Sequence, residues 1–169
     1  MDESAPGHGD VLRVAARPLG RRQIRMRILV AADGSSHANR ALDFAARLAK
    51  ELKGVEVTLI NVGHIPITEI APIGNPGYVD YGAMEEALER AGRQILEDAA
   101  KPFAANDMRV TPLYHSGDPA AEIIRAAREK KVELIIVGAR GLSQLSGLIL
   151  GSVSEKVLHV APCPVIVVR

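Results

Sequence analysis

The fold is decided by ELIIVGA, residues 133–139, and by the glycine-rich segment that continues it, GARGLSQLSGLILGS, residues 138–152. The first part is a continuous apolar run of strand length, typical of a central strand buried on both faces of a parallel sheet. The second part holds four glycines and one charged residue, Arg140. Because glycine lets the backbone approach a ligand closely, this segment is either a loose connection or a binding loop.

Outward from this stretch, apolar runs of strand length alternate with segments that have the three- and four-residue spacing of a helix. We expect strands at residues 26–32, 55–62, 108–115, 133–139 and 164–168. We expect helices between the turn at 33–35 and Gly54, over 84–99, from 119 to about 130, and over 152–160, with a long Gly- and Pro-rich loop at 63–82. The alternation predicts an α/β fold, a doubly wound five-stranded parallel sheet with helices on both faces, of the Rossmann-like type.

Local signals add detail to this pattern. Pro112 lies inside the third strand and cannot donate to a ladder, which favours a strand at the sheet edge. The pair Asp118-Pro119 is an N-cap followed by a first-turn proline, and Pro102 should end the second helix. Ser152 with Glu155 three positions later is a capping box that would begin the last helix.

The composition is that of an ordinary globular chain. It has 169 residues, the size of a single domain, with 47% hydrophobic, 24% charged and only 3% aromatic residues. The single cysteine, Cys163, excludes an internal disulfide framework and fits a reducing compartment. No apolar run approaches the roughly 20 residues of a membrane span, and no signal peptide is apparent. We therefore expect a cytoplasmic protein with no membrane partner.

The charge is unevenly distributed. Residues 1–27 carry six arginines against three carboxylates, whereas residues 28–169 have a net charge of −2. Without a basic face or an aromatic platform for bases, the body gives no sign of a nucleic-acid partner. We expect residues 1–25 to be a disordered basic leader and residues 26–169 to form one domain; Met26 is an alternative start of translation.

Two segments are candidates for a binding site. In a doubly wound sheet, ligands bind beyond the carboxyl ends of the strands, where the winding direction reverses. Asp33-Gly34-Ser35 follows the first strand, and the glycine-rich segment follows the fourth. If those two strands are neighbours, both segments face one crevice, which favours the binding loop over the loose connection.

The glycine spacing is the most specific motif of the chain. Gly138 is followed after two residues by Gly141, and after nine more by Gly151-Ser152; neither a Walker A motif nor G-x-G-x-x-G is present. This G-2x-G-9x-G-S pattern resembles the nucleotide loop of the universal stress protein family, in its ATP-binding branch. The likeness includes ADGS before the first helix, LINV at the end of the second strand and the C-terminal GSVSEKVLHVAPCPVIVV, and so covers about residues 26–169.

The resemblance implies a fold like that of the adenine nucleotide alpha hydrolases and a bound ATP, with Mg²⁺ or Mn²⁺ on the phosphates in place of a lysine. Asp33 would accept hydrogen bonds from adenosine, and Val62 would meet the adenine edge through its backbone. The glycine backbone and the start of the last helix would cradle the phosphates, with Arg140 as a partial counter-charge. The expected nucleotide-binding residues are Ala32, Asp33, Val62, Gly138, Arg140, Gly141, Gly151, Ser152, Val153 and Ser154.

Catalytic or metal-binding residues are not indicated by any motif. No two of the five histidines share metal-ligand spacing, and none is paired in sequence with a Ser or Cys nucleophile. Three interpretations remain: a regulator whose ATP occupancy is read by an unknown protein partner, with at most slow hydrolysis or self-phosphorylation; an ATP hydrolase or phosphotransferase; and an adaptor without nucleotide. The glycine spacing weighs against the third and the absence of a base against the second, so we favour the first.

The C-terminal segment PVIVV, residues 164–168, predicts a self-association surface. An uncharged apolar edge strand is an aggregation hazard unless something pairs with it. We expect a homodimer in which two copies of this strand pair antiparallel about a two-fold axis, as the resemblance also implies. Its interface would contain Val165, Ile166, Val167 and Val168; the alternative is a monomer whose leader covers the edge.

Overall fold

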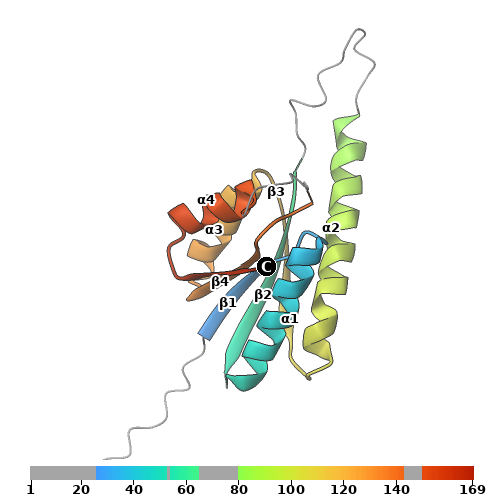
Figure 1. The fold of residues 1–169 in the computed structure, drawn as a ribbon. Coiled ribbons are helices and arrows are strands. Elements are labelled where there is room, and N and C mark those ends of the chain that lie inside the picture. The colour runs from blue at the N-terminus through green and yellow to red at the C-terminus, as the bar shows by residue number, and fades with distance from the viewer. Residues whose placement is uncertain (1–25, 53, 65–79, 143–149) are drawn as a thin grey trace, which may run out of the picture.

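The computed structural model describes residues 26–52, 54–64, 80–142 and 150–169. Over these residues the chain forms one five-stranded sheet in the order β3-β2-β1-β4-β5, and every neighbouring pair is parallel (Figure 1). The strands are β1 (Met26–Ala31), β2 (Val55–Gly63), β3 (Val110–Ser116), β4 (Leu134–Gly138) and β5 (Val165–Val168). The predicted doubly wound parallel sheet is confirmed.

Helices cover both faces of the sheet. They are α1 (Ser36–Glu51), α2 (Tyr81–Ala104), α3 (Pro119–Glu129) and α4 (Ser152–Val160). Helices α1 and α2 pack against one face and α3 and α4 against the other, as the two layers of Figure 1 show. Within the described ranges, no helix is both long and apolar enough to cross a membrane.

Each face of the sheet has its own apolar core, because successive strand residues point to opposite faces. Ile28, Val30 and Leu59 pack under α1 and α2, whereas Leu29 and Ile60 pack under α3 and α4. Strands β1 and β4 supply fully buried residues to both cores, as expected for strands in the interior of a parallel sheet.

Several local signals act as the sequence predicts. Strand β3, which contains Pro112, lies at one edge of the sheet. The Asp118 side chain caps α3 by accepting from the Ala121 N–H at 2.9 Å, with Pro119 as the first helical residue. Ser35 caps α1 by accepting from the Ala38 N–H at 3.1 Å. Most of the expected 63–82 loop, residues 65–79, lies outside the described residues.

Helix α2 differs from the prediction in two ways. It continues past Pro102 to Ala104, because the next residue, Phe103, is fully buried and anchors the last turn in the core. It also begins at Tyr81 rather than at the expected residue 84, and its buried residues are Gly92, Leu96, Ala99 and Phe103, all from residue 92 onward. The first half of α2 is largely exposed and extends beyond the sheet (Figure 1).

The order of the strands fixes the position of any crevice. From β1 the chain winds through β2 to β3 on one side, and β4 and β5 lie on the other side of β1. The winding therefore reverses between β1 and β4, which pair directly from Ile28–Leu134 to Val30–Ile136. The two candidate segments, which follow these strands, meet at this switch point.

Candidate functional site

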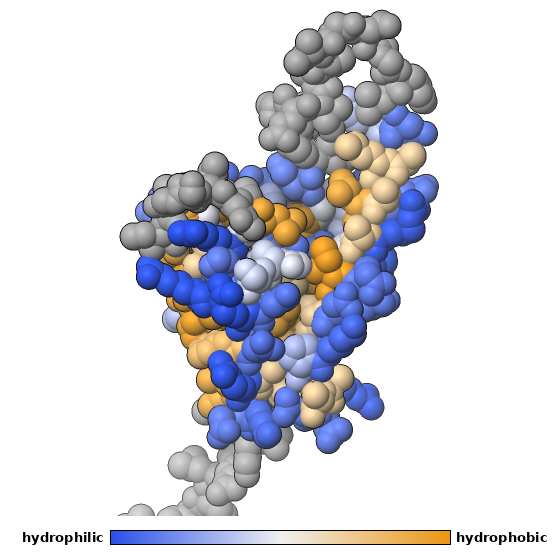
Figure 2. All heavy atoms as spheres, turned by 45° about the vertical axis from the view of Figure 1, so that its right-hand side comes forward, coloured by the Kyte–Doolittle hydropathy of each residue, from blue (hydrophilic) through white to orange (hydrophobic). Residues whose placement is uncertain are grey.

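A cavity of about 410 Å³ opens at the carboxyl ends of β1, β2 and β4, within the usual range of small-molecule sites. Apolar side chains follow α2 along this side of the molecule (Figure 2). The cavity brings together every residue predicted for the nucleotide site, namely Ala32, Asp33, Val62, Gly138, Arg140, Gly141, Gly151, Ser152, Val153 and Ser154.

The turn after β1 ties the site together. Asp33 Oδ1 accepts from the Ser35 N–H at 2.9 Å, which folds the carboxylate back over the start of α1. The Ser35 hydroxyl donates to the Arg140 carbonyl at 3.3 Å and so links α1 to the segment after β4. The Asp33 carboxylate is thus held at the reversal point, next to the glycine-rich segment.

The three motif glycines differ in what a side chain at each position would contact. A Cβ on Gly138 would lie 2.7 Å from Ala38 N and from the His37 carbonyl carbon, so the close packing of β4 against α1 requires this glycine. A Cβ on Gly141 would lie 2.7 Å from Asp33 Oδ2, so this glycine leaves room for the carboxylate. Among the described residues, a Cβ on Gly151 would meet nothing closer than Arg140 Cα, at 3.4 Å, and φ there is −81°. Of the three, only Gly151 is not required by its neighbours in the described part of the chain.

The start of α4 faces the cavity without a side-chain cap. The N-cap is Gly151 rather than Ser152, so the predicted capping box of Ser152 and Glu155 is wrong. The Gly151 N–H donates to the Ala139 carbonyl at 2.8 Å. The Ser154 hydroxyl is also turned to the protein, at 2.9 Å from the Ala139 carbonyl and 2.8 Å from that of Gly151.

These contacts hold the loop but leave the first-turn amides of α4 without intrahelical acceptors. The amides of Ser152 and Val153 line the cavity with the positive end of the helix dipole behind them. Such a helix start binds anions, phosphate groups among them.

Strand β2 presents a second set of polar backbone groups. In a parallel ladder the N–H and C=O of one residue face the same neighbour, and the next residue faces the other way. The Ile60 carbonyl accepts from Ala32 N at 2.9 Å, and the Gly63 carbonyl accepts from Gly117 N at 2.9 Å. Residue 62 therefore faces the β1 side, where β1 has already left the sheet. The Val62 N–H and C=O consequently point into the cavity.

The structure also brings in residues that the sequence analysis did not select. Leu88, Ala91, Gly92 and Ile95 of α2 form one apolar wall, and Pro119 and Ile123 of α3 form another. Asn61 and His64 add polar groups, and His64 Nδ1 lies 3.0 Å from the Gly117 carbonyl. The α2 stripe has helical spacing, but nothing in the sequence shows that it faces a cavity instead of the core.

Charged groups lie on either side of the switch point. Partial burial and the guanidinium groups of Arg40 and Arg140 lower the pKa of His37, which the Asp33 carboxylate opposes. Arg140 places a guanidinium group on the cavity wall. In the part of the chain that the structure describes, no group of three or more His, Cys, Asp or Glu residues forms a metal site.

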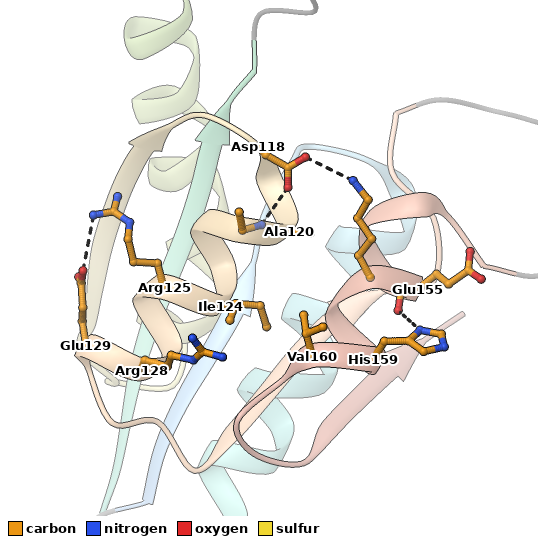
Figure 3. A pocket seen from close by; sticks show the side chains of 11 residues that line it. Asp118, Ala120, Ile124, Arg125, Arg128, Glu129, Glu155, His159 and Val160 are labelled. Carbon is orange, nitrogen blue, oxygen red and sulfur yellow. Dashed lines mark hydrogen bonds and ion pairs between the residues drawn. The ribbon is translucent and has the colours of Figure 1, made fainter.

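A second cavity, of about 780 Å³, is a groove between α3 and α4 on the outer surface (Figure 3). Ala120, Ile124 and Val160 form its apolar floor. Charged side chains across the rim pair with one another: Lys156 lies 3.5 Å from Asp118, and Arg125 lies 3.5 Å from Glu129. The backbone N–H of Ala121 and, more weakly, Lys156 hold the pKa of Asp118 below its usual value. None of the predicted site residues lines this groove.

The fold and the first cavity define a doubly wound α/β protein with a binding crevice at its topological switch point. The family model described as the universal stress protein family matches residues 25–169. The chain is 38% identical over 146 residues to universal stress protein YxiE of Bacillus subtilis (strain 168), a match that covers 85% of this chain and 98% of the relative. The chain therefore belongs to the universal stress protein family.

Solved structures agree with this assignment. The structure of hypothetical protein MJ0577 superposes with a TM-score of 0.71 at 28% identity, over 84% of this chain and 94% of the other. A universal stress protein from Archaeoglobus fulgidus, solved in complex with dAMP, superposes with a TM-score of 0.59 at 26% identity, over 86% and 99% of the two chains.

The different constraints on the glycines predict different effects on stability in ligand-free protein. Gly138→Ala should lower the free energy of unfolding by about 2–3 kcal/mol, because the new methyl group overlaps the α1 backbone. Gly151→Ala should cost at most about 1 kcal/mol, the difference between glycine and alanine at an N-cap. Urea denaturation of both variants tests this, and equal losses would contradict it.

Proposed function

We propose that this chain is an ATP-binding regulatory protein whose nucleotide occupancy acts as a signal in a stress response. One observation carries the proposal: two sets of backbone groups converge on one crevice from either side of Asp33. The Val62 N–H and C=O lie on the β2 side, and the amides of Ser152 and Val153 lie on the α4 side. A nucleotide has a polar base edge and an anionic phosphate chain at its two ends, and this arrangement suits both.

The β2 side suits adenine. A backbone N–H can donate to N1 of adenine while the carbonyl of the same residue accepts from the 6-amino group, on the Watson–Crick edge of the base. Guanine presents an N–H and a carbonyl at these positions, which would oppose the Val62 groups. The walls formed by α2 and α3 supply apolar surface for the flat base. The dAMP complex of the Archaeoglobus fulgidus relative supports an adenine nucleotide.

The α4 side suits phosphate. Amides at an uncapped helix start, together with the nearby Gly141 backbone, offer several donors to phosphate oxygens. Asp33, between the two ends, would accept from the ribose hydroxyls. Arg140 would supply part of the counter-charge, and Mg²⁺ or Mn²⁺ carried on the phosphates would supply the rest.

We favour a regulator over an enzyme. It would act in the cytoplasm, where a protein partner would recognise the nucleotide-bound form. The donors around the phosphate end are backbone amides, which bind phosphate without transferring a proton from water. Steady ATP turnover near the median enzyme rate of about 10 s⁻¹, abolished by Gly151→Ala, would instead favour the hydrolase or phosphotransferase.

The glycine-rich loop also suggests how to test ATP binding. A methyl group on Gly151 would lie 3.6 Å from the Gly141 nitrogen, over an amide expected to face the phosphates. Gly151→Ala should therefore weaken the binding of Mg-ATP by about ten-fold or more, since charge-assisted hydrogen bonds to phosphate would be lost. Isothermal titration calorimetry of the unmodified chain should also show weaker binding of GTP than of ATP.

Gly82→Ala is the matched control, because Gly82 lies on the exposed first turn of α2 and the nearest atom to its new methyl group among the described residues would be Asp80 Oδ1, at 3.3 Å. That variant should bind Mg-ATP as the unmodified chain does. Equal affinity in Gly151→Ala and Gly82→Ala would defeat the loop assignment, and no ATP binding by the unmodified chain would defeat the proposed function.

We also propose the homodimer through β5. This strand lies at the sheet edge opposite β3. The Pro164 carbonyl accepts from Ile135 N of β4 at 3.0 Å, and the Val168 carbonyl accepts from Ala139 N, just after β4, at 2.7 Å. By the alternation of a parallel ladder, the N–H and C=O of Val165 and Val167 face outward. An antiparallel partner strand would pair with these groups.

The outward direction of the Val167 N–H provides a direct test of the dimer. Val167→Pro should remove an outward N–H without breaking a bond to β4, and so raise the dimer dissociation constant by about ten-fold or more. Val167→Ala, which trims the side chain but keeps the N–H, should dimerise nearly as the unmodified chain does. Sedimentation velocity over a range of concentrations checks both, and a monomeric unmodified chain at micromolar concentration would rule the dimer out.

A further inference from the structure

The ladder between β1 and β2 ends one hydrogen bond earlier than its geometry allows. Ala32 faces β2, because its N–H donates to the Ile60 carbonyl at 2.9 Å. Its carbonyl faces the same way, and in a continued parallel ladder it would accept from the Val62 N–H. Instead it accepts from Asn61 Nδ2 at 2.7 Å. A side-chain amide thus takes the place of the next backbone donor.

The orientation of the Asn61 amide is fixed by this contact. A carbonyl can only accept, so the nitrogen of the amide must face Ala32, and Oδ1 must face away from it. The side chain is buried, with 6% of its surface exposed. On the other side it packs against Gly92 of α2, where a Cβ would lie 2.4 Å from Asn61 Oδ1. Helix α2 therefore holds Asn61 against the end of β1.

The Tyr114 ring packs into the same region, beside Gly92 and Gly63. A Cβ on Gly92 would also lie 2.4 Å from Tyr114 Cε2, and a Cβ on Gly63 would lie 2.1 Å from the Tyr114 hydroxyl. Two glycines, on α2 and β2, thus make room for one ring beside Asn61. With little free space around it, the amide is held in a single position.

We propose that Asn61 is a positioning residue for ligand binding: by occupying the Ala32 carbonyl, it keeps the Val62 N–H open to an acceptor atom of the ligand. The acceptor is a ring nitrogen of a purine base, an identification that rests on the proposed function. Without Asn61, the Ala32 carbonyl and the Val62 N–H would lie at the end of an intact ladder with each other as partners. Since Ala32 is buried, with 2% of its surface exposed, and a buried carbonyl is almost always paired, that bond would form, and a ligand would have to break it.

The substitution Asn61→Leu removes the donor and keeps a side chain of similar length. In ligand-free protein, amide hydrogen exchange at Val62, followed by NMR, should slow by about ten-fold or more as its N–H gains the Ala32 acceptor. The Leu59 amide, which faces β3, is the internal reference and should not change. The affinity for Mg-ATP should fall by about ten-fold, the effect expected for one net hydrogen bond.

A second variant covers the case in which Asn61→Leu fails to fold, since leucine is bulkier than asparagine and would lie beside Gly92 and Tyr114. Asn61→Asp keeps the shape, but at neutral pH its carboxylate cannot donate to the Ala32 carbonyl; it should also slow Val62 exchange. Asn39→Leu, on the exposed face of α1, is the matched control and should change neither readout.

The exchange measurement needs no ligand, so it separates this inference from the proposed function. Unchanged Val62 exchange in a folded Asn61 variant would overturn the inference, whatever the affinity for ATP. Slower exchange together with a loss of ATP affinity would support it. Slower exchange in a chain whose unmodified form binds no ATP would support the role of Asn61 at the ladder and count against a nucleotide as the ligand.

Discussion

The structure depends on the point at which β1 leaves the sheet. Strand β1 is central, pairs with β2 and β4, and contributes fully buried residues to both cores. Once it turns away at Asp33, the ends of β2 and β4 are left without the neighbour that separated them. The crevice lies where β1 would have continued, and on its β2 side it exposes backbone groups of Val62 that a longer β1 would have paired.

This origin bears on the proposed nucleotide site. Backbone donors are fixed by the strands and by α4, so they would lose no side-chain entropy if a ligand bound, and few charged side chains would be needed. Their positions are secured by contacts within the protein: Ser35 to the Arg140 carbonyl, Gly151 N to the Ala139 carbonyl, and Asn61 to the Ala32 carbonyl. Each contact satisfies a carbonyl beside the crevice and leaves neighbouring amides directed into it.

The sequence was sufficient for the fold and for placing the proposed site residues around one cavity. Hydrophobic period, strand length and capping residues depend on local structure, and they predicted all five strands, the edge position of β3 and the start of α3. What failed depended on contacts between distant segments. Pro102 does not end α2, because Phe103 is buried. The N-cap of α4 is Gly151 and not Ser152, and the Gly151 N–H donates to the Ala139 carbonyl just after β4.

The glycine motif shows the same difference between what a local pattern predicts and what contacts between distant segments decide. The spacing of Gly138, Gly141 and Gly151 can be read in the sequence, but it presents the three as one loop with one purpose. In the folded chain the first accommodates α1 and the second accommodates the Asp33 carboxylate. Among the described residues, only the third meets nothing closer than an ordinary contact distance. A glycine that these neighbours do not require fits the proposal that a ligand approaches the backbone closely beside Gly151.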